Sequence, residues 1–141
     1  MTGRWLLAVA VLGLALVGAA CGEPADAPEL DALRADPMAS YQGQDLTLVD
    51  RSLSAGGRTL GKPVRASVVQ RYAIADSADP EAVRAAAIAA AEAAGWTFFA
   101  EGPIASANKR IAGSQATLSI EVREEQGQAF LTVVLLEEAG E

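Results

Sequence analysis

The sequence predicts a small α+β domain, in which one Ala-rich helix packs on one face of a mostly antiparallel sheet of four to six strands. Apolar and polar residues alternate over 64–74 and again over 116–123, which is the period of half-buried strands. An alanine-rich helical segment lies between them, over 80–94. Because the strands are segregated on either side of this helix, the order favours an antiparallel sheet over a parallel one.

Two strands are expected before the helix. The first is a short apolar strand over 46–49, followed by a glycine-rich loop over 52–62. The second runs over 64–74, and Gln70 is the one polar residue on its apolar face. This part of the sequence therefore predicts a short strand, a long loop and a well-formed second strand.

The helix over 80–94 has clear end signals. Asp79 is placed to cap it, Pro80 suits the first helical position, and Gly95 suits a left-handed turn after its end. Its small side chains are expected to form a narrow face that lets the helix lie close to the sheet. That face comprises Val83, Ala86, Ala87, Ala90 and Ala94.

Three or four strands are expected after the helix, and glycines separate the last of them. Gly113 and Gly127 predict turns, the second of them a hairpin loop. The predicted strands cover 96–100, 108–111, 116–123 and 130–136.

The N-terminal segment has the order of an export signal. Arg4 gives a positively charged start, and residues 5–20 carry no charge. Sixteen apolar or small residues are fewer than the roughly 20 that span a bilayer as a permanent helix. The run ends in Gly18, Ala19 and Ala20 before Cys21, the one cysteine of the chain.

These residues resemble the lipobox of bacterial lipoprotein signal peptides. Ala19 and Ala20 fit the pattern, and Gly18 stands where the family usually has Leu or Val. The resemblance implies that the thiol of Cys21 receives diacylglycerol and that 1–20 is a cleaved signal peptide. The protein would then be exported and lipid-anchored to the outer face of the cytoplasmic membrane. An ordinary cleaved signal that leaves Cys21 as a free thiol, and an uncleaved anchor, are the alternatives.

A wider resemblance extends into the rest of the chain. Asp-Pro-Met-Ala at 36–39 and Ala-Ala-Gly-Trp-Thr at 93–97 are similar to segments of small uncharacterised lipoproteins of high-GC Gram-positive bacteria. The motifs are short, and they imply a lineage and a layout without an activity.

The domain organisation expected from these features has three parts. Residues 1–20 are the signal peptide, 21–44 are the lipidated cysteine with a flexible tether, and 45–141 are a single α+β domain. Leu30 and Leu33 interrupt the tether, and a short helical piece there is expected to pack on the domain.

Composition excludes several classes of function. The net charge of −7 argues against nucleic-acid binding, which requires a basic surface, and no nucleic-acid partner is expected. The chain has no histidine, the commonest general base and metal ligand. Its single cysteine excludes an intrachain disulfide. No catalytic residue, metal or cofactor is therefore assigned.

Weak candidate sites remain. Residues 56–63 come within one residue of a phosphate-binding P-loop, but Pro63 replaces the required hydroxyl, so a hairpin loop is expected instead. Asp76 and Asp79 flank the turn before the helix and could form a metal site or an acid pair, but capping already explains Asp79. Serines could pair with Lys62 or Lys109, although no histidine is present to activate them.

Basic and aromatic side chains offer two further candidates. A solvated loop face is the expected role of the basic residues, and contact with lipid phosphates or an acidic wall polymer is the alternative. That set comprises Arg58, Lys62 and Arg65, with Lys109 and Arg110 as possible additions. Trp96, Phe98 and Phe99 are expected in the core, with a ligand groove as the alternative.

The expected function is that of a non-catalytic accessory or protein-binding module at the cell envelope, anchored to the membrane through lipid on Cys21. A small binder of lipid or another hydrophobic ligand, held between helix and sheet, is the second hypothesis. An enzyme is the third, because histidine and a second cysteine are absent.

Overall fold

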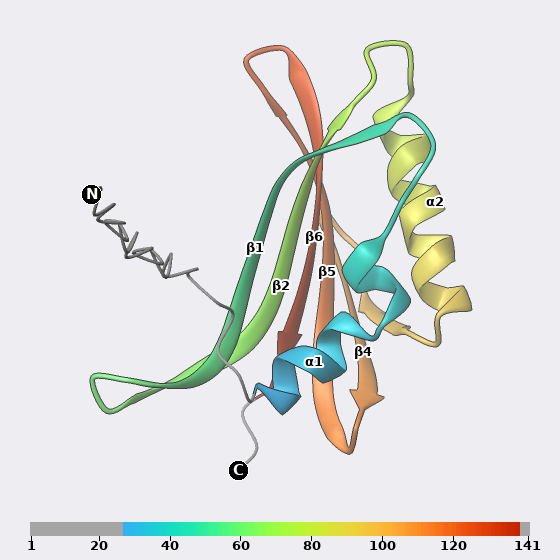
Figure 1. The fold of residues 1–141 in the computed structure, drawn as a ribbon. Coiled ribbons are helices and arrows are strands. Elements are labelled where there is room, and N and C mark those ends of the chain that lie inside the picture. Colours follow the sequence, from blue (N-terminus) through green and yellow to red (C-terminus); the bar gives the residue numbers. More distant parts are fainter. Residues whose placement is uncertain (1–26, 139–141) are drawn as a thin grey trace, which may run out of the picture.

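A computed structural model describes residues 27–138 of the chain. In this range a six-stranded sheet carries two α-helices and a short 3-10 helix, all on the same face (Figure 1). The helices are α1 (Pro28–Arg34), the 3-10 helix η1 (Pro37–Ser40) and α2 (Pro80–Ala93). The strands are β1 (Leu46–Thr59), β2 (Lys62–Ile74), β3 (Thr97–Ala100), β4 (Ile104–Ile111), β5 (Ser114–Glu125) and β6 (Gln128–Glu137).

The topology is a hairpin, a helix and a meander. Strands β1 and β2 form the hairpin, α2 follows, and β3 to β6 run back and forth until β6 pairs with β2. The order across the sheet is β1-β2-β6-β5-β4-β3, and every neighbouring pair is antiparallel. The predicted α+β class with an antiparallel sheet is confirmed. The expectation of one helix is wrong, because α1 and η1 cover the part of the sheet that α2 does not reach.

Three tight turns connect the hairpins. Each joins two strands through two residues with positive φ, the conformation of a type I′ turn, which matches the right-handed twist of the strands. The turn residues are Leu60–Gly61, Ala112–Gly113 and Gln126–Gly127. Glycine occupies the second position of each turn, and the sequence predicted turns at two of them, Gly113 and Gly127.

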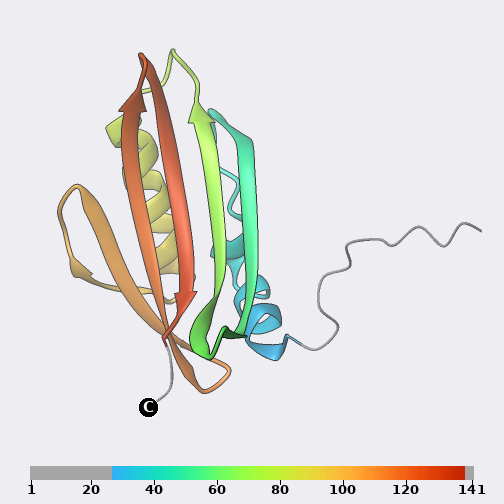
Figure 2. The same ribbon diagram turned by 90° about the vertical axis from the view of Figure 1, so that its left-hand side faces the viewer.

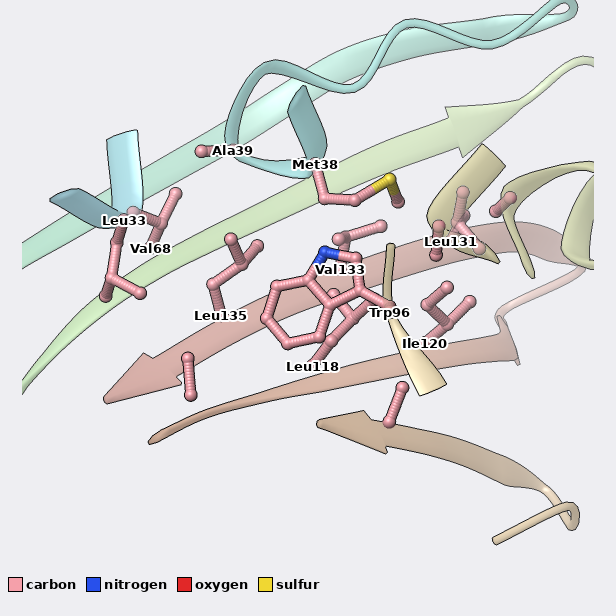
Figure 3. Close-up of a cluster of buried hydrophobic side chains, with 14 of the residues drawn as sticks. Leu33, Met38, Ala39, Val68, Trp96, Leu118, Ile120, Leu131, Val133 and Leu135 are labelled. Atoms are coloured by element: carbon pink, nitrogen blue, oxygen red, sulfur yellow. The ribbon is translucent and has the colours of Figure 1, made fainter. Parts of the chain in front are cut away.

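The core lies between the helices and one face of the sheet. Trp96, just before β3, lies among Met38 of η1 and Leu118 of β5 in Figure 3, and its side chain is almost fully buried. The largest fully buried apolar side chains are Leu33, Met38, Val68, Leu118, Ile120, Leu131, Val133 and Leu135. Side chains from α1, η1 and four strands belong to one cluster. These elements are therefore expected to fold and unfold together.

Helix α2 begins and ends where the sequence predicts, but the face that it buries is different. The Asp79 side chain accepts a hydrogen bond from Glu81 N at 3.1 Å, which caps the first turn. The buried residues are Val83, Ala87 and Ala91, while Ala86 is exposed. Alanines occur on several sides of this helix, so their positions in the sequence do not identify the buried face. The predicted alanine-rich face is wrong. The sheet selects one i, i+4, i+8 line among equivalent small residues.

Residues 28–40 belong to the folded body. Leu30 and Leu33 of α1, together with Met38 of η1, are buried in the core. The predicted packing of the short helical piece on its own domain is confirmed for this segment, and the flexible tether over 21–44 is corrected from residue 27 onwards. The reason is that these apolar side chains cover β1 and β2, which α2 leaves uncovered, and share the surface of β6 with α2.

Strand β1 is much longer than predicted. The expected loop over 52–62 is a continuation of β1 to Thr59, paired with β2 up to the turn. Gly56 has a φ of 78°, and a Cβ there would lie 2.8 Å from Ala66 N. Glycine is required at this point by the close approach of the neighbouring strand, and does not interrupt β1.

Candidate functional site

A buried ionic cluster joins α1, α2 and β4. The Asp36 carboxylate, between α1 and η1, is only 1% exposed. Its Oδ2 accepts from Lys109 Nζ at 2.7 Å, and its Oδ1 accepts from Trp96 Nε1 at 3.1 Å and from Met38 N at 2.9 Å. Lys109 also donates to the carbonyl of Ala94 at 2.6 Å, where a cation opposes the negative end of the α2 dipole.

This cluster holds elements of the fold together. Every oxygen of Asp36 has a donor, and the lysine is held between the carboxylate and a helix carbonyl. A buried charge is tolerated when it is paired and hydrogen-bonded in this way. No pattern in the sequence pairs Asp36 with Lys109, because the two residues lie 73 positions apart.

A second network of hydrogen bonds links Gln70 and Tyr72 to the segment that contains Tyr41. Gln70, the one mismatch on the apolar face of β2, donates from Nε2 to Met38 O at 2.8 Å. The Tyr72 hydroxyl lies 2.6 Å from Tyr41 O and 2.9 Å from Gln70 Oε1. Burial raises the pKa of Tyr72 to about 12, partly opposed by the positive charge of Arg51. These bonds fix η1 and the segment after it to the first hairpin.

A surface hollow of about 340 Å³ lies beside this network. Leu46 and Leu48 of β1 contribute apolar surface to it, and Arg51 contributes a guanidinium that also donates to Ala39 O at 2.9 Å. The hollow is wide and open to solvent, and the polar groups around it are already used in holding η1.

The predicted basic residues divide into separate groups. Arg58, Lys62 and Arg65 lie on the β1–β2 hairpin and are exposed. Lys109 points into the core toward Asp36, so it cannot join them, while its neighbour Arg110 is exposed on β4. The hairpin residues therefore form the basic spot alone, and the predicted addition of Lys109 is wrong.

The P-loop resemblance and the acid pair are explained by local structure. Residues 56–63 form the end of the β1–β2 hairpin, as expected, and no helix follows them. Asp79 caps α2. Within residues 27–138, no group of three or more His, Cys, Asp or Glu side chains could hold a metal ion.

The three aromatic residues have different environments. Trp96 is 3% exposed and Phe98 packs against the core, as predicted. Phe99 is 62% exposed, because alternation along β3 places it on the opposite side of the strand from Phe98. They do not line a common groove.

The sheet has one face that none of the described helices covers. We call it the open face, and it looks toward the viewer in Figure 2. On its central strands short hydroxyl side chains lie among apolar and charged ones, and these side chains are half-buried. Its central side chains are Ser67, Val69, Arg71, Thr117, Ser119, Glu121, Phe130, Thr132, Val134 and Leu136.

Two ion pairs lie at one end of the open face. Arg71 donates to Glu125 Oε2 at 2.6 Å, and its guanidinium carbon lies 3.9 Å from the centroid of the Phe130 ring. Arg123 donates to Glu121 Oε1 at 2.7 Å. The remaining surface of the central strands carries hydroxyl groups beside half-exposed Val and Leu side chains, and the Thr117 hydroxyl donates to Glu138 Oε1 at 2.9 Å.

Cys21, the expected lipidation site, lies outside the described residues. No helix within residues 27–138 has the length and apolar character needed to cross a membrane. Comparison of the chain with protein-family models, curated proteins and solved structures found no match.

Proposed function

We propose that this protein is exported, anchored by lipid on Cys21 to the outer face of the cytoplasmic membrane, and acts there as a non-catalytic module that binds another envelope protein. The lipobox-like residues before Cys21 support the anchor. A thioether-linked diacylglycerol with an N-acyl chain supplies the two or more chains that stable anchoring requires.

The open face is the observation that supports protein binding. Helices cover only one side of the sheet, and the other side presents half-buried Val69, Val134 and Leu136 among serines and threonines. A sheet face that no described helix covers offers a protein partner a broad contact surface, whereas small-molecule sites are concave and largely enclosed.

The packing of the core makes hydrophobic-ligand binding the weaker proposal. An acyl chain was expected to lie between the helices and the sheet. That space holds fully buried side chains, among them Met38, Leu118 and Leu131, together with Trp96. A ligand there would have to displace side chains packed at the density of a protein interior.

The anchor is tested with Cys21→Ser in the native host. The substituted protein should appear in the soluble exported fraction, and intact-mass measurement of the unsubstituted protein should show acyl chains on Cys21. Membrane retention of the serine variant would show that the anchor is something other than this lipid.

The binding surface is tested with a photo-crosslinking amino acid in living cells. Placed at Ser106 on the open face, it should give one dominant covalent adduct with an envelope protein. Placed at Ala89, an exposed position of α2, it should not. Ser119→Arg, which adds a charge next to Ser106, should abolish the adduct while leaving thermal unfolding nearly unchanged. Equal crosslinking from both positions, or no effect of Ser119→Arg, would contradict binding through this face.

A further inference from the structure

The β1–β2 hairpin extends beyond the rest of the sheet. Strand β2 pairs with β6 only from Ser67 to Ala73, whereas β1 and β2 remain paired as far as Thr59 and Lys62. About five residues of two-stranded ribbon therefore project past the end of β6, roughly 16 Å at the rise of a strand. Figure 1 shows this projection at the lower left. We call residues 55–66 the hairpin arm.

The hairpin arm is cationic in an acidic protein. It carries Arg58, Lys62 and Arg65 and no acid, although the net charge of the chain is −7. All three are exposed, and none forms an ion pair with a carboxylate of residues 27–138.

An apolar side chain stands at the tip of the arm. Leu60 is 98% exposed and has a φ of 51°, in the left-handed region that a bulky side chain rarely adopts. The equivalent positions of the other two turns hold Ala112 and Gln126. Only this turn therefore places a large apolar group in solvent, between flanking cations.

The arm lies at the end of the domain where the chain enters from Cys21. Pro28 and Glu29, at the start of α1, lie beside Ala112 in the turn between β4 and β5. In the register of the sheet, that turn and the arm are at the same end, because Ser67 pairs with Leu136 and Leu136 pairs with Thr117. Six residue steps separate Cys21 from Ala27, which span at most roughly 20 Å.

Acidic side chains are concentrated away from the arm. Asp45, Asp76, Asp79, Glu124 and Glu125 are all exposed at the opposite end of the sheet. Acids also occur at the root of the arm, on α1 and at the end of β6. The tip is more than one Debye length, about 8 Å at physiological ionic strength, from that root.

We propose that the hairpin arm contacts anionic phospholipid of the membrane that holds the lipid anchor, with Leu60 entering the interface and Arg58, Lys62 and Arg65 binding phosphates. This contact rests on the proposed anchoring at Cys21. A tether shorter than the domain brings the arm to the surface, and the opposite end, with its acids, is repelled from anionic head groups. Two contacts, the anchor and the arm, then fix the orientation of the open face relative to the membrane.

The test uses a probe at two matched turns of the acylated full-length protein. Because acylation consumes Cys21, Leu60→Cys or Gln126→Cys carries the only free thiol, and both positions have nearly the same positive φ. Each is labelled with an environment-sensitive dye and reconstituted in vesicles of phosphatidylcholine with phosphatidylglycerol, or of phosphatidylcholine alone. Nitroxide lipids should quench the dye at position 60 several-fold more than at 126, and only with phosphatidylglycerol present.

Charge variants and an unlabelled measurement complete the test. Arg58→Gln combined with Lys62→Gln, or raised salt, should remove the quenching at position 60. In the unlabelled protein, amide exchange over 57–62 should slow in the anionic vesicles relative to the neutral ones. An acylated protein whose position 60 remains in water with unchanged amide exchange overturns the arm contact alone. A mature protein without acyl chains on Cys21 overturns the anchor instead.

Discussion

Lys109 Nζ lies 2.7 Å from Asp36 Oδ2, an ion pair between residues 73 positions apart whose carboxylate is 1% exposed and whose lysine is 25% exposed. The pair connects the segment between α1 and η1 to β4, and Lys109 also donates to the carbonyl of Ala94, the residue after the end of α2. Three elements that are distant in the sequence therefore depend on one amino group.

Removing that amino group should destabilise the fold strongly. Lys109→Ala leaves Asp36 buried without its cation, and we expect a loss of about 3 kcal/mol in the free energy of unfolding. Urea denaturation measures it. Arg110→Ala, next in sequence but exposed, is the matched control and should change stability by less than about 0.5 kcal/mol. Equal effects of the two substitutions would show that the ion pair contributes little.

Removing α1 and η1 should prevent folding. A chain that begins at Asp45 exposes the apolar surface of β2 and β6 that Leu33 and Met38 cover, so we expect loss of near-ultraviolet circular dichroism and aggregation. A chain that begins at Gly22 should fold. In the latter, Leu33→Ala should cost about 2–5 kcal/mol, whereas the exposed change Glu29→Gln should cost little. A stable, monomeric protein from Asp45 onwards would contradict the inclusion of α1 in the core.

Adjacent alanines of α2 should respond oppositely to enlargement. Ala87 is fully buried against the sheet, so Ala87→Leu forces the helix outward and should lower stability by about 1–3 kcal/mol. Ala86 is exposed, and Ala86→Leu should be nearly neutral. Thermal unfolding of both variants distinguishes the buried face from the predicted one, which included both residues. A larger loss from Ala86→Leu would mean that α2 is rotated.

Stability should fall at alkaline pH as Tyr72 ionises. Burial raises its pKa to about 12 in the folded protein, above about 10 in an unfolded chain. The unfolded state therefore loses its proton first. The contribution is complete below pH 10 and is lost as pH rises from about 10 to about 12. Urea denaturation across this range should show a decline that is shallower in Tyr72→Phe. A residual decline is expected there, because burial also raises the pKa of Tyr41. An unchanged slope in the variant would exclude Tyr72 as the group responsible.

Local patterns in the sequence predicted the parts of the fold that local physics determines. Alternation identified β2 and β5, and glycine at the second turn position identified two of the hairpins. Asp79 and Pro80 located the start of α2. Each of these features depends on residues within a few positions of one another.

The errors arose where a distant segment supplied the stabilising partner. Gly56 and Gly57 suggested a loop, yet they continue β1 because β2 provides its hydrogen bonds. The segment before Asp45 suggested a tether, yet its few apolar residues fill the space beside α2.

The sequence by itself determined the α+β class, two of the hairpin turns, the ends of α2 and the acidic net charge. It could not determine that Lys109 faces Asp36, that Gln70 bonds to Met38, or that three cations gather on a projecting arm. Those relationships depend on the register of strands and on helices packed across the sheet. Side chains far apart in the chain acquire their partners, their burial and their charge environment only when the tertiary structure brings them together.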